Sequence, residues 1–206
     1  MEKNGKKAVV IGMAKSGIAS AKLLYELGYD VTVNDMKTDI KGLKEELSGI
    51  EYKDALGVDH AEAVKGADLV VLSPVVPIFS PFVDEARAAG AEVIGEIELG
   101  YRYCDRGTKF ICISGTNGKT TTTALTGELF KAAGKHTFVL GNIGVPITAH
   151  ARETKAGDYV VAETAALQLE SIADFHANAF GMLNITEDHL NRFRYKMENY
   201  IAAKCR

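Results

Sequence analysis

Short runs of β-branched residues alternate with helical patterns along the whole chain, and this alternation is what most constrains the fold. It is typical of α/β proteins, in which a helix connects each strand to the next parallel strand. The expected strands are residues 7–11, 31–33, 69–72, 92–94, 110–114, 137–140, 159–162 and 179–183. The expected helices are residues 16–27, 43–47, 83–89, 121–133 and 197–206, the first of them capped by Ser16.

The length of 206 residues corresponds to about 1.4 domains at the usual ~150 residues each. After residues 101–107 the alternation restarts with a new strand, a glycine-rich loop and a helix. We therefore expect one domain over residues 1–105 and a second over residues 106–206.

The composition excludes several classes of protein. Hydrophobic residues make up 47% of the chain and charged residues 25%, which excludes a disordered or fibrous protein. The net charge of −3 gives no general attraction to nucleic acid or anionic lipid, so any phosphate must be bound locally. No apolar run approaches the ~20 residues that cross a bilayer, and residues 1–7 lack the core of a signal peptide, so we expect a cytoplasmic protein. The three cysteines form no Cys-x-x-Cys pair, which argues against a disulfide framework or a zinc cluster.

The strongest functional signal follows the strand expected at residues 110–114. It reads Gly115-Thr116-Asn117-Gly118-Lys119-Thr120-Thr121 and opens a helix. The N–H groups of a glycine-rich turn at a helix N-terminus point at phosphate oxygens, while Lys119 can reach the β- and γ-phosphates and Thr120 can ligate Mg²⁺. The loop is shorter than the standard motif, whose first glycine would fall at Ile113. The sequence thus predicts an ATP-binding loop of variant spacing in a P-loop-type α/β domain.

A second, weaker glycine loop follows the first strand. Residues 12–17 resemble a dinucleotide-binding turn, but Ala14 stands where a glycine normally lets the backbone approach a pyrophosphate. Asp35, after the second strand, can bind a ribose or a base. These residues predict a Rossmann-like domain that binds either NAD or another nucleotide diphosphate.

Four segments together resemble the Mur ligases and their folylpolyglutamate synthetase relatives. Besides the Ser-Gly-Thr-Asn-Gly-Lys-Thr-Thr loop, they are Gly141-Asn142-Ile143-Gly144, the box Asn184-Ile185-Thr186-Glu187-Asp188-His189-Leu190, and Ala202-Ala203-Lys204. Their order and spacing also fit, since Lys204 lies 15 residues after His189. The resemblance covers the whole chain and is strongest to the branch that adds D-glutamate.

The resemblance implies roles for individual residues. The first domain would bind the uridine diphosphate part of a substrate through Lys15, Ser16, Asp35, Met36, Lys37, Ser73 and Pro74. Asn142, Gln168 and His189 would contact the rest of that substrate. ATP would bind to Gly115, Thr116, Asn117, Gly118, Lys119, Thr120 and Thr121. Lys119, His189 and Lys204 are the implied catalytic residues.

The resemblance also implies two Mg²⁺ ions. Thr120 and Glu163 would hold the first, because Glu163 ends a strand beside the phosphate loop. His189 and Lys204 would serve the second, the lysine after carbamylation to an anionic oxygen ligand. Ala165 departs from the family, which usually has a serine there, so a hydroxyl contact to the substrate is lost. We expect the basic residues Arg192, Arg194 and Lys196 to lie on a solvated face.

The implied activity is ATP-dependent ligation of D-glutamate to UDP-N-acetylmuramoyl-L-alanine through an acyl phosphate, in peptidoglycan synthesis. A monomer with no nucleic-acid or membrane partner is expected. The helical pattern stops at Arg206 without a capping glycine, which predicts a fragment that lacks the C-terminal ligase domain and turns over weakly or not at all. An NAD-dependent oxidoreductase, a non-catalytic nucleotide-binding module and folylpolyglutamate synthetase remain as alternatives.

Overall fold

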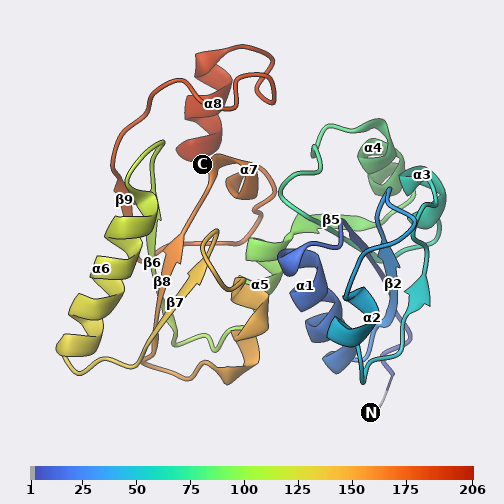
Figure 1. Ribbon diagram of the computed structural model, residues 1–206, viewed down its shortest axis with the longest axis horizontal. Helices are drawn as coiled ribbons and strands as arrows, with labels where there is room; N and C mark the ends of the chain where they lie inside the picture. The colour runs from blue at the N-terminus through green and yellow to red at the C-terminus, as the bar shows by residue number, and fades with distance from the viewer. Residues whose placement is uncertain (1–2) are drawn as a thin grey trace. The chain divides into compact units, whose positions relative to one another are not determined.

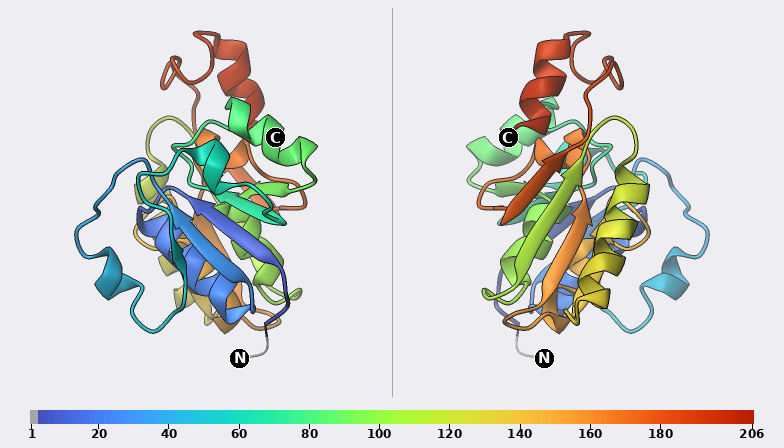
Figure 2. Two further views of the ribbon diagram at one scale, coloured as in Figure 1. Left: turned by 90° about the vertical axis from the view of Figure 1, so that its right-hand side faces the viewer. Right: turned by 90° about the vertical axis from the view of Figure 1, so that its left-hand side faces the viewer.

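The computed structural model describes residues 3–206 and divides into two compact units, Met1–Leu99 and Gly100–Arg206 (Figure 1). Each unit holds one sheet whose paired strands all run parallel, as the two views of Figure 2 show. The α/β class expected from the alternation of strands and helices is confirmed. The division falls between Leu99 and Gly100, within a helix, and not in the 101–107 stretch.

The first unit contains a five-stranded sheet in the order β3-β2-β1-β4-β5. Because the chain leaves β1 for β2 on one side and later returns to β4 on the other, the strand order reverses between β1 and β4, where α/β proteins bind ligands. The elements of this unit are β1 (Lys7–Ile11), α1 (Lys15–Glu26), β2 (Asp30–Asn34), α2 (Leu43–Glu46), β3 (Lys53–Asp54), α3 (His60–Ala63), β4 (Leu69–Leu72), α4 (Pro81–Ala88) and β5 (Glu92–Gly95).

β4 is apolar throughout and β1 is apolar after Lys7, because helices cover both faces of these central strands. Val9 and Ile11 pack with Phe82 and Val83 of α4 on one face. Side chains alternate along a strand, so Ala8 and Val10 point to the other face, where α1 packs against the sheet. Burial on both sides explains why these strands appear in the sequence as unbroken apolar runs.

The second unit contains a four-stranded sheet in the order β7-β8-β6-β9, with β6 in the interior. Glu163 pairs with Ile113 on β6 and with Gly141 on β7, so these three strands end at the same edge. The elements here are α5 (Glu96–Tyr103), which begins in the first unit, then β6 (Lys109–Ser114), α6 (Lys119–Ala132), β7 (Thr137–Gly141), β8 (Tyr159–Glu163), α7 (Ala166–Leu169), β9 (Ala179–Met182) and α8 (Met197–Lys204). Two short 3₁₀ helices, Ile147–Ala149 and Ala151–Glu153, lie between β7 and β8.

All eight expected strands and all five expected helices are present, with ends that shift by a few residues. One local expectation was wrong: Ser16 does not cap α1, which begins at Lys15 with Ala14 in the N-cap position. The sequence pattern also missed β3, α3, α5 and α7. Strands of two residues and helices of four are too short to show a hydrophobic period.

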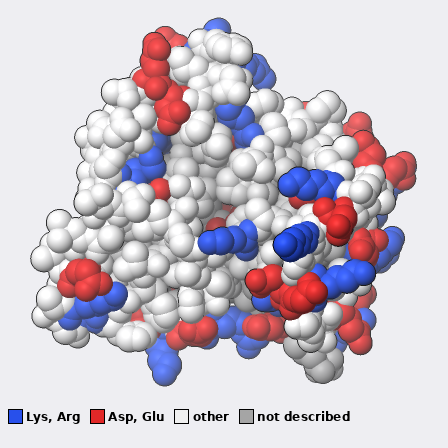
Figure 3. Space-filling model, viewed as in Figure 1, with Lys and Arg blue, Asp and Glu red and all other residues white. Residues whose placement is uncertain are grey.

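No helix in residues 3–206 is long and apolar enough to cross a membrane. On the face of the molecule drawn in Figure 3, acidic and basic side chains of the described residues are interspersed. This mixed surface agrees with the net charge of −3. A phosphate group would therefore have to be recognised by a local arrangement of donors.

Candidate functional site

The phosphate loop joins β6 to α6, and two glycines shape it. Gly115 has a φ of +150° and is packed so closely that a Cβ would lie 3.1 Å from the Leu183 Cβ. Gly118 has a φ of +81° and forms the N-cap of α6. Glycine adopts these angles without the strain that another residue would suffer. The loop therefore turns sharply at both ends and leads into the N-terminus of a helix of 14 residues.

The loop lies against the segment that follows β9. The Thr116 N–H donates to the Asn184 carbonyl at 3.0 Å. The Asn184 side chain accepts from the Asn117 N–H at 2.9 Å and donates to the Asn117 carbonyl at 3.0 Å. Three hydrogen bonds thus tie two loop residues to one asparagine.

Lys119 is the first residue of α6, and its Nζ donates to the Thr116 carbonyl at 2.8 Å. This contact folds the lysine back over the loop that it follows. The ammonium group and the N-terminus of α6 both place positive charge at the same turn. An anion bound there would meet backbone donors and a lysine together.

A cluster of oxygen and amide groups lies beside the loop at the end of β8. Glu163, only 2% exposed, accepts a hydrogen bond from the Thr120 Oγ1 at 2.8 Å and one from the Asn142 Nδ2 at 2.7 Å. Gly141 allows the end of β7 to lie close to the backbone of Glu163, because a Cβ there would come within 2.3 Å of the Glu163 carbonyl oxygen. The structure thus joins Asn142, implied as a substrate contact, to Thr120 and Glu163, which were implied together as metal ligands.

The chemistry of this cluster fits Mg²⁺. Magnesium prefers oxygen ligands and is usually held by one or two carboxylates together with the phosphates of its substrate. The Glu163 carboxylate and the Thr120 hydroxyl supply such oxygens. Within residues 3–206, no group of three His, Cys, Asp or Glu side chains forms a metal site, so phosphates or water would have to complete the coordination.

His189 stands apart from this cluster. It is exposed, has a φ of +50°, and lies 3.5 Å from the Asp188 carboxylate. Across the described residues, no hydrogen bond or ion pair joins it to Glu163, Thr120 or Lys204. Of the two implied metal sites, the first therefore shows a direct contact between its residues, Thr120 and Glu163, while His189 and Lys204 make none in the described part of the chain.

Lys204 is buried at the end of α8, with 2% of its surface exposed. Its Nζ donates to the Gly115 carbonyl at 2.8 Å, so this lysine also contacts the phosphate loop. Burial, together with the positive charge of Lys119, lowers the pKa of Lys204 from its ordinary value of 10.5 to about 8. The amine is therefore much more easily neutralised than that of an exposed lysine.

This shift predicts a pH-dependent contribution to stability. Between pH 8 and pH 10.5 the unfolded chain holds a proton on Lys204 that the folded chain has released. The free energy of unfolding should therefore rise with pH in this window, by at most about 1.4 kcal/mol per pH unit. The measurement is urea unfolding of the wild type and Lys204→Met from pH 7 to pH 10. The variant should lack this component of the slope, and Lys131→Met on the exposed side of α6 should keep it. Equal slopes in all three proteins would contradict the assignment.

Gln168 is 4% exposed, and its Oε1 accepts from the Ala165 N–H at 2.9 Å. It therefore caps the first turn of α7. The expectation for Arg192 was wrong: its side chain is only 11% exposed and forms two hydrogen bonds with the Glu170 carboxylate, at 2.8 and 3.1 Å. Arg192 therefore forms an ion pair with Glu170 instead of lying on a solvated face, and nothing in the sequence pattern indicates this partner.

In the first unit, three loops meet at the carboxyl edge of the sheet. The Asp35 carboxylate accepts from the Met13 N–H at 2.9 Å and from the Lys37 N–H at 3.0 Å, so it ties the first glycine loop to the turn after β2. Gly12 has a φ of +92°, and a Cβ there would lie 2.7 Å from the Ser73 Cβ. The remaining implied residues follow the same strand ends: Lys15 and Ser16 open α1, Met36 and Lys37 are exposed, and Pro74 lies in the loop after β4.

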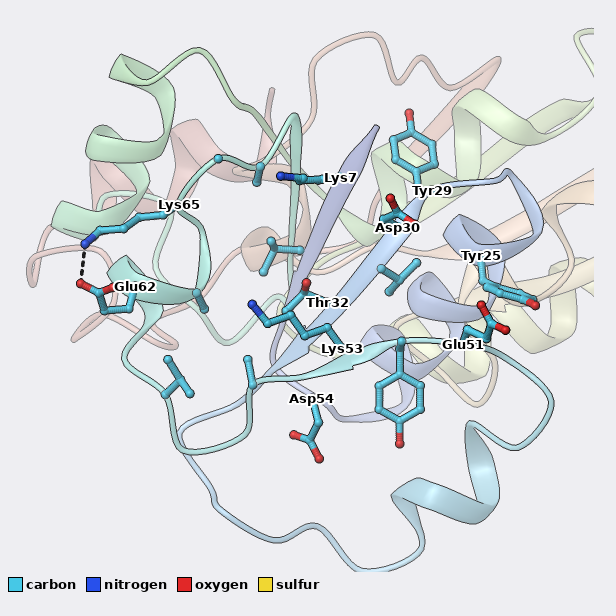
Figure 4. A pocket seen from close by; sticks show the side chains of 18 of the residues that line it. Lys7, Tyr25, Tyr29, Asp30, Thr32, Glu51, Lys53, Asp54, Glu62 and Lys65 are labelled. Atoms are coloured by element: carbon cyan, nitrogen blue, oxygen red, sulfur yellow. Dashed lines mark hydrogen bonds and ion pairs between the residues drawn. The ribbon is translucent and has the colours of Figure 1, made fainter. Parts of the chain in front are cut away.

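A cavity of about 600 Å³ lies elsewhere on this unit, over β1, β2 and β3 (Figure 4). Half of its charged side chains are paired with one another, since Lys3 pairs with Asp30 at 2.9 Å and Lys65 pairs with Glu62. None of the seven implied substrate residues of this unit lines the cavity. The candidate nucleotide site therefore rests on the strand ends and not on this hollow.

Sequence reasoning missed three residues that hold the phosphate loop. Asn184 contacts Asn117 as described above, Thr186 contacts Thr116 through its backbone, and Tyr200 contacts the Thr116 hydroxyl. Asn184 and Thr186 belong to the motif of residues 184–190, in which only His189 was given a functional role. Their position directly after an expected strand was the signal that could have pointed to them.

Two family models match this chain. Residues 113–206 match the Mur ligase middle domain, and residues 6–95 match the N-terminal domain of MurD-like Mur ligases. Among curated relatives, the UDP-N-acetylmuramoylalanine--D-glutamate ligase of Alkaliphilus metalliredigens is 46% identical over 99% of this chain. The enzyme of the same name from Clostridioides difficile is 43% identical, also over 99%. The chain spans 45% of the length of each of these relatives.

Solved structures show the same fold. A UDP-N-acetylmuramate:L-alanyl-γ-D-glutamyl-meso-diaminopimelate ligase from Neisseria meningitides covers 97% of this chain with a TM-score of 0.61 and 17% identity, and the chain covers 67% of it. The UDP-N-acetylmuramate-alanine ligase of Thermotoga maritima covers 96% with a TM-score of 0.57 and 22% identity, and the chain covers 45% of it. At these identities the likeness concerns the fold alone.

Proposed function

Because the chain belongs to the Mur ligase family, we propose that it forms the substrate- and ATP-binding part of an ATP-dependent amide ligase. The substrates proposed are UDP-N-acetylmuramoyl-L-alanine, D-glutamate and ATP, as the names of its 43–46% identical relatives suggest. ATP would phosphorylate the terminal carboxylate of the UDP precursor, and the amine of D-glutamate would then displace phosphate from the acyl phosphate. We further propose that the enzyme acts as a monomer in the cytoplasm.

One observation carries this proposal: Lys119, Thr120 and Glu163 lie together at the end of a parallel sheet. The Thr120 hydroxyl and the Glu163 carboxylate are 2.8 Å apart, and Lys119 follows the glycine loop directly. Phosphoryl transfer needs little covalent help from a protein and depends mainly on positioning and on neutralising charge. Positioning would come from the N–H donors of the loop. Charge would be neutralised by Lys119 and by a Mg²⁺ ion held by the two oxygen ligands.

The proposed roles follow from these positions. The loop amides and Lys119 would bind the β- and γ-phosphates, while Thr120 and Glu163 would hold the first Mg²⁺. When bound, the ion would neutralise charge on the transferring phosphoryl group. In the first unit, the Gly12 loop would face the diphosphate, and Asp35, Lys37 and Ser73 would bind the uridine part of the precursor.

We also propose that Lys204 becomes carbamylated and serves a second Mg²⁺ with His189. A neutral amine is the form that reacts with carbon dioxide, and the lowered pKa of Lys204, about 8, favours that form. The carbamate nitrogen would keep one N–H, which can still donate to the Gly115 carbonyl. Carbon-13 NMR with labelled bicarbonate should show a carbamate signal that Lys204→Met lacks, and an identical spectrum from the variant would rule out this site.

Calorimetry tests the substrate assignment without requiring turnover. The chain should bind UDP-N-acetylmuramoyl-L-alanine and not NADH. Asp35→Ala should weaken precursor binding by about tenfold, because the carboxylate that joins the two loops is lost. Asp39→Ala, an exposed change nearby, is the matched control. Binding of NADH without binding of the precursor would favour the oxidoreductase alternative.

A further inference from the structure

The hydroxyl of Thr116, in the middle of the phosphate loop, has three hydrogen-bonding neighbours. It lies 3.0 Å from the Thr186 N, 3.1 Å from the Thr186 carbonyl oxygen and 3.1 Å from the Tyr200 hydroxyl. A threonine hydroxyl has one proton to donate and two lone pairs to accept with. All of this capacity is therefore in use.

The direction of each bond follows from that inventory. The Thr186 carbonyl can only accept, so it takes the proton of the Thr116 hydroxyl. The Thr186 N–H can only donate, and it uses one lone pair of Thr116. The Tyr200 hydroxyl must then donate to the other lone pair. Burial raises the pKa of Tyr200, which keeps its hydroxyl protonated as a donor requires.

Tyr200 is itself held firmly. Its side chain is 1% exposed, and its ring packs on Phe193 with centroids 5.2 Å apart. The Lys204 Nζ lies 4.9 Å from the centre of the same ring and donates to the Gly115 carbonyl. Residues four apart on a helix share a face. One face of α8 therefore reaches two successive residues of the loop, Gly115 through Lys204 and Thr116 through Tyr200.

We infer that Tyr200 is a positioning residue, whose hydroxyl sets the conformation of the phosphate loop through Thr116. Tyr200 lies outside the four segments that carry the resemblance to the Mur ligases. The Thr116 carbonyl accepts the Lys119 Nζ and its hydroxyl accepts Tyr200, so α8 and the loop lysine converge on one residue. Loss of the tyrosine hydroxyl should release Thr116 and, with it, the donors that face the phosphates.

The test uses Tyr200→Phe, which keeps the ring and its packing but removes the hydroxyl. In the nucleotide-free chain, exchange of the Thr116 and Thr186 amide protons, followed by NMR, should speed up about 3- to 10-fold, in line with loss of one hydrogen bond. Thr116→Val removes the acceptor of the Thr186 N–H itself and should accelerate exchange at Thr186 at least as much. The double variant should add little to Thr116→Val alone, because that change already removes the contact with Tyr200. Unchanged exchange in Tyr200→Phe would overturn the inference.

A second measurement separates positioning from general stability and rests on the proposed ATP-binding function. Tyr200→Phe should weaken binding of an ATP analogue about 3- to 10-fold. Phe193→Leu, which alters the packing around Tyr200 without touching the loop, should lower Tm but leave the affinity unchanged. If the wild type binds no nucleotide, the proposed function fails while amide exchange still decides the role of Tyr200. Equal losses of affinity in Tyr200→Phe and Phe193→Leu would reduce Tyr200 to a packing residue and overturn the inference.

Discussion

Replacing Lys119 with alanine should weaken ATP binding to this chain at least about 100-fold. A lysine that bonds to phosphate oxygens makes charge-assisted hydrogen bonds, which contribute about 1.5–3 kcal/mol each. The ammonium group lies at the N-terminus of α6, where its charge and the helix N–H groups would act on the same phosphates. The affinity for ATP, measured by calorimetry, is the quantity to compare.

The control for this experiment must show that the loop keeps its shape. Lys119 donates to the Thr116 carbonyl in the ligand-free chain, so its loss frees that carbonyl as well. The three bonds from the backbone of the loop to Asn184 remain and should preserve the turn. Lys131→Ala, which removes an exposed cation of the same helix, should bind ATP like the wild type. Unchanged binding by Lys119→Ala would favour a non-catalytic nucleotide-binding module.

The fold could be predicted to a large extent because its central strands are buried on both faces. Such strands leave continuous apolar runs, as in residues 69–72, which need no knowledge of their neighbours to be recognised. The edge strand β3, with two exposed residues, leaves no such trace. Helix α5 was missed in part because its last residues, from Tyr101, were interpreted as a domain boundary, although the chain is helical through Tyr103.

The part of the candidate site that lies at the ends of strands could be predicted from the sequence. Lys119, Thr120 and Glu163 each follow or close an apolar run, and neighbouring parallel strands end at one edge, so their meeting could be expected. Contacts that arise only when distant segments pack together could not be predicted from the sequence. Tyr200 resembles any core residue of an amphipathic helix, and Arg192 resembles a surface charge. Their partners, Thr116 and Glu170, lie 84 and 22 residues away, and only the folded chain brings them together.

Replacing Glu163 with glutamine should remove most of the gain in ATP affinity that Mg²⁺ provides. The side chains have nearly the same shape, so the change removes charge and one acceptor with little effect on packing. The remaining carbonyl oxygen can still accept from Asn142, and the Thr120 hydroxyl can rotate to accept from the new amide. We therefore expect a folded variant whose defect concerns the metal.

The expected size and sign of this effect distinguish it from a general loss of binding. With Mg²⁺, Glu163→Gln should bind ATP about 10- to 100-fold more weakly than the wild type, because a charged oxygen ligand is lost. Without Mg²⁺ it should bind ATP as well as the wild type or better, since a buried negative charge no longer faces the phosphates. Glu153→Gln, an exposed change, should leave both affinities as they are. If the wild type and Glu163→Gln respond equally to Mg²⁺, Glu163 does not hold the ion, and the carboxylate would instead serve only to fix Thr120 and Asn142 at the end of the sheet.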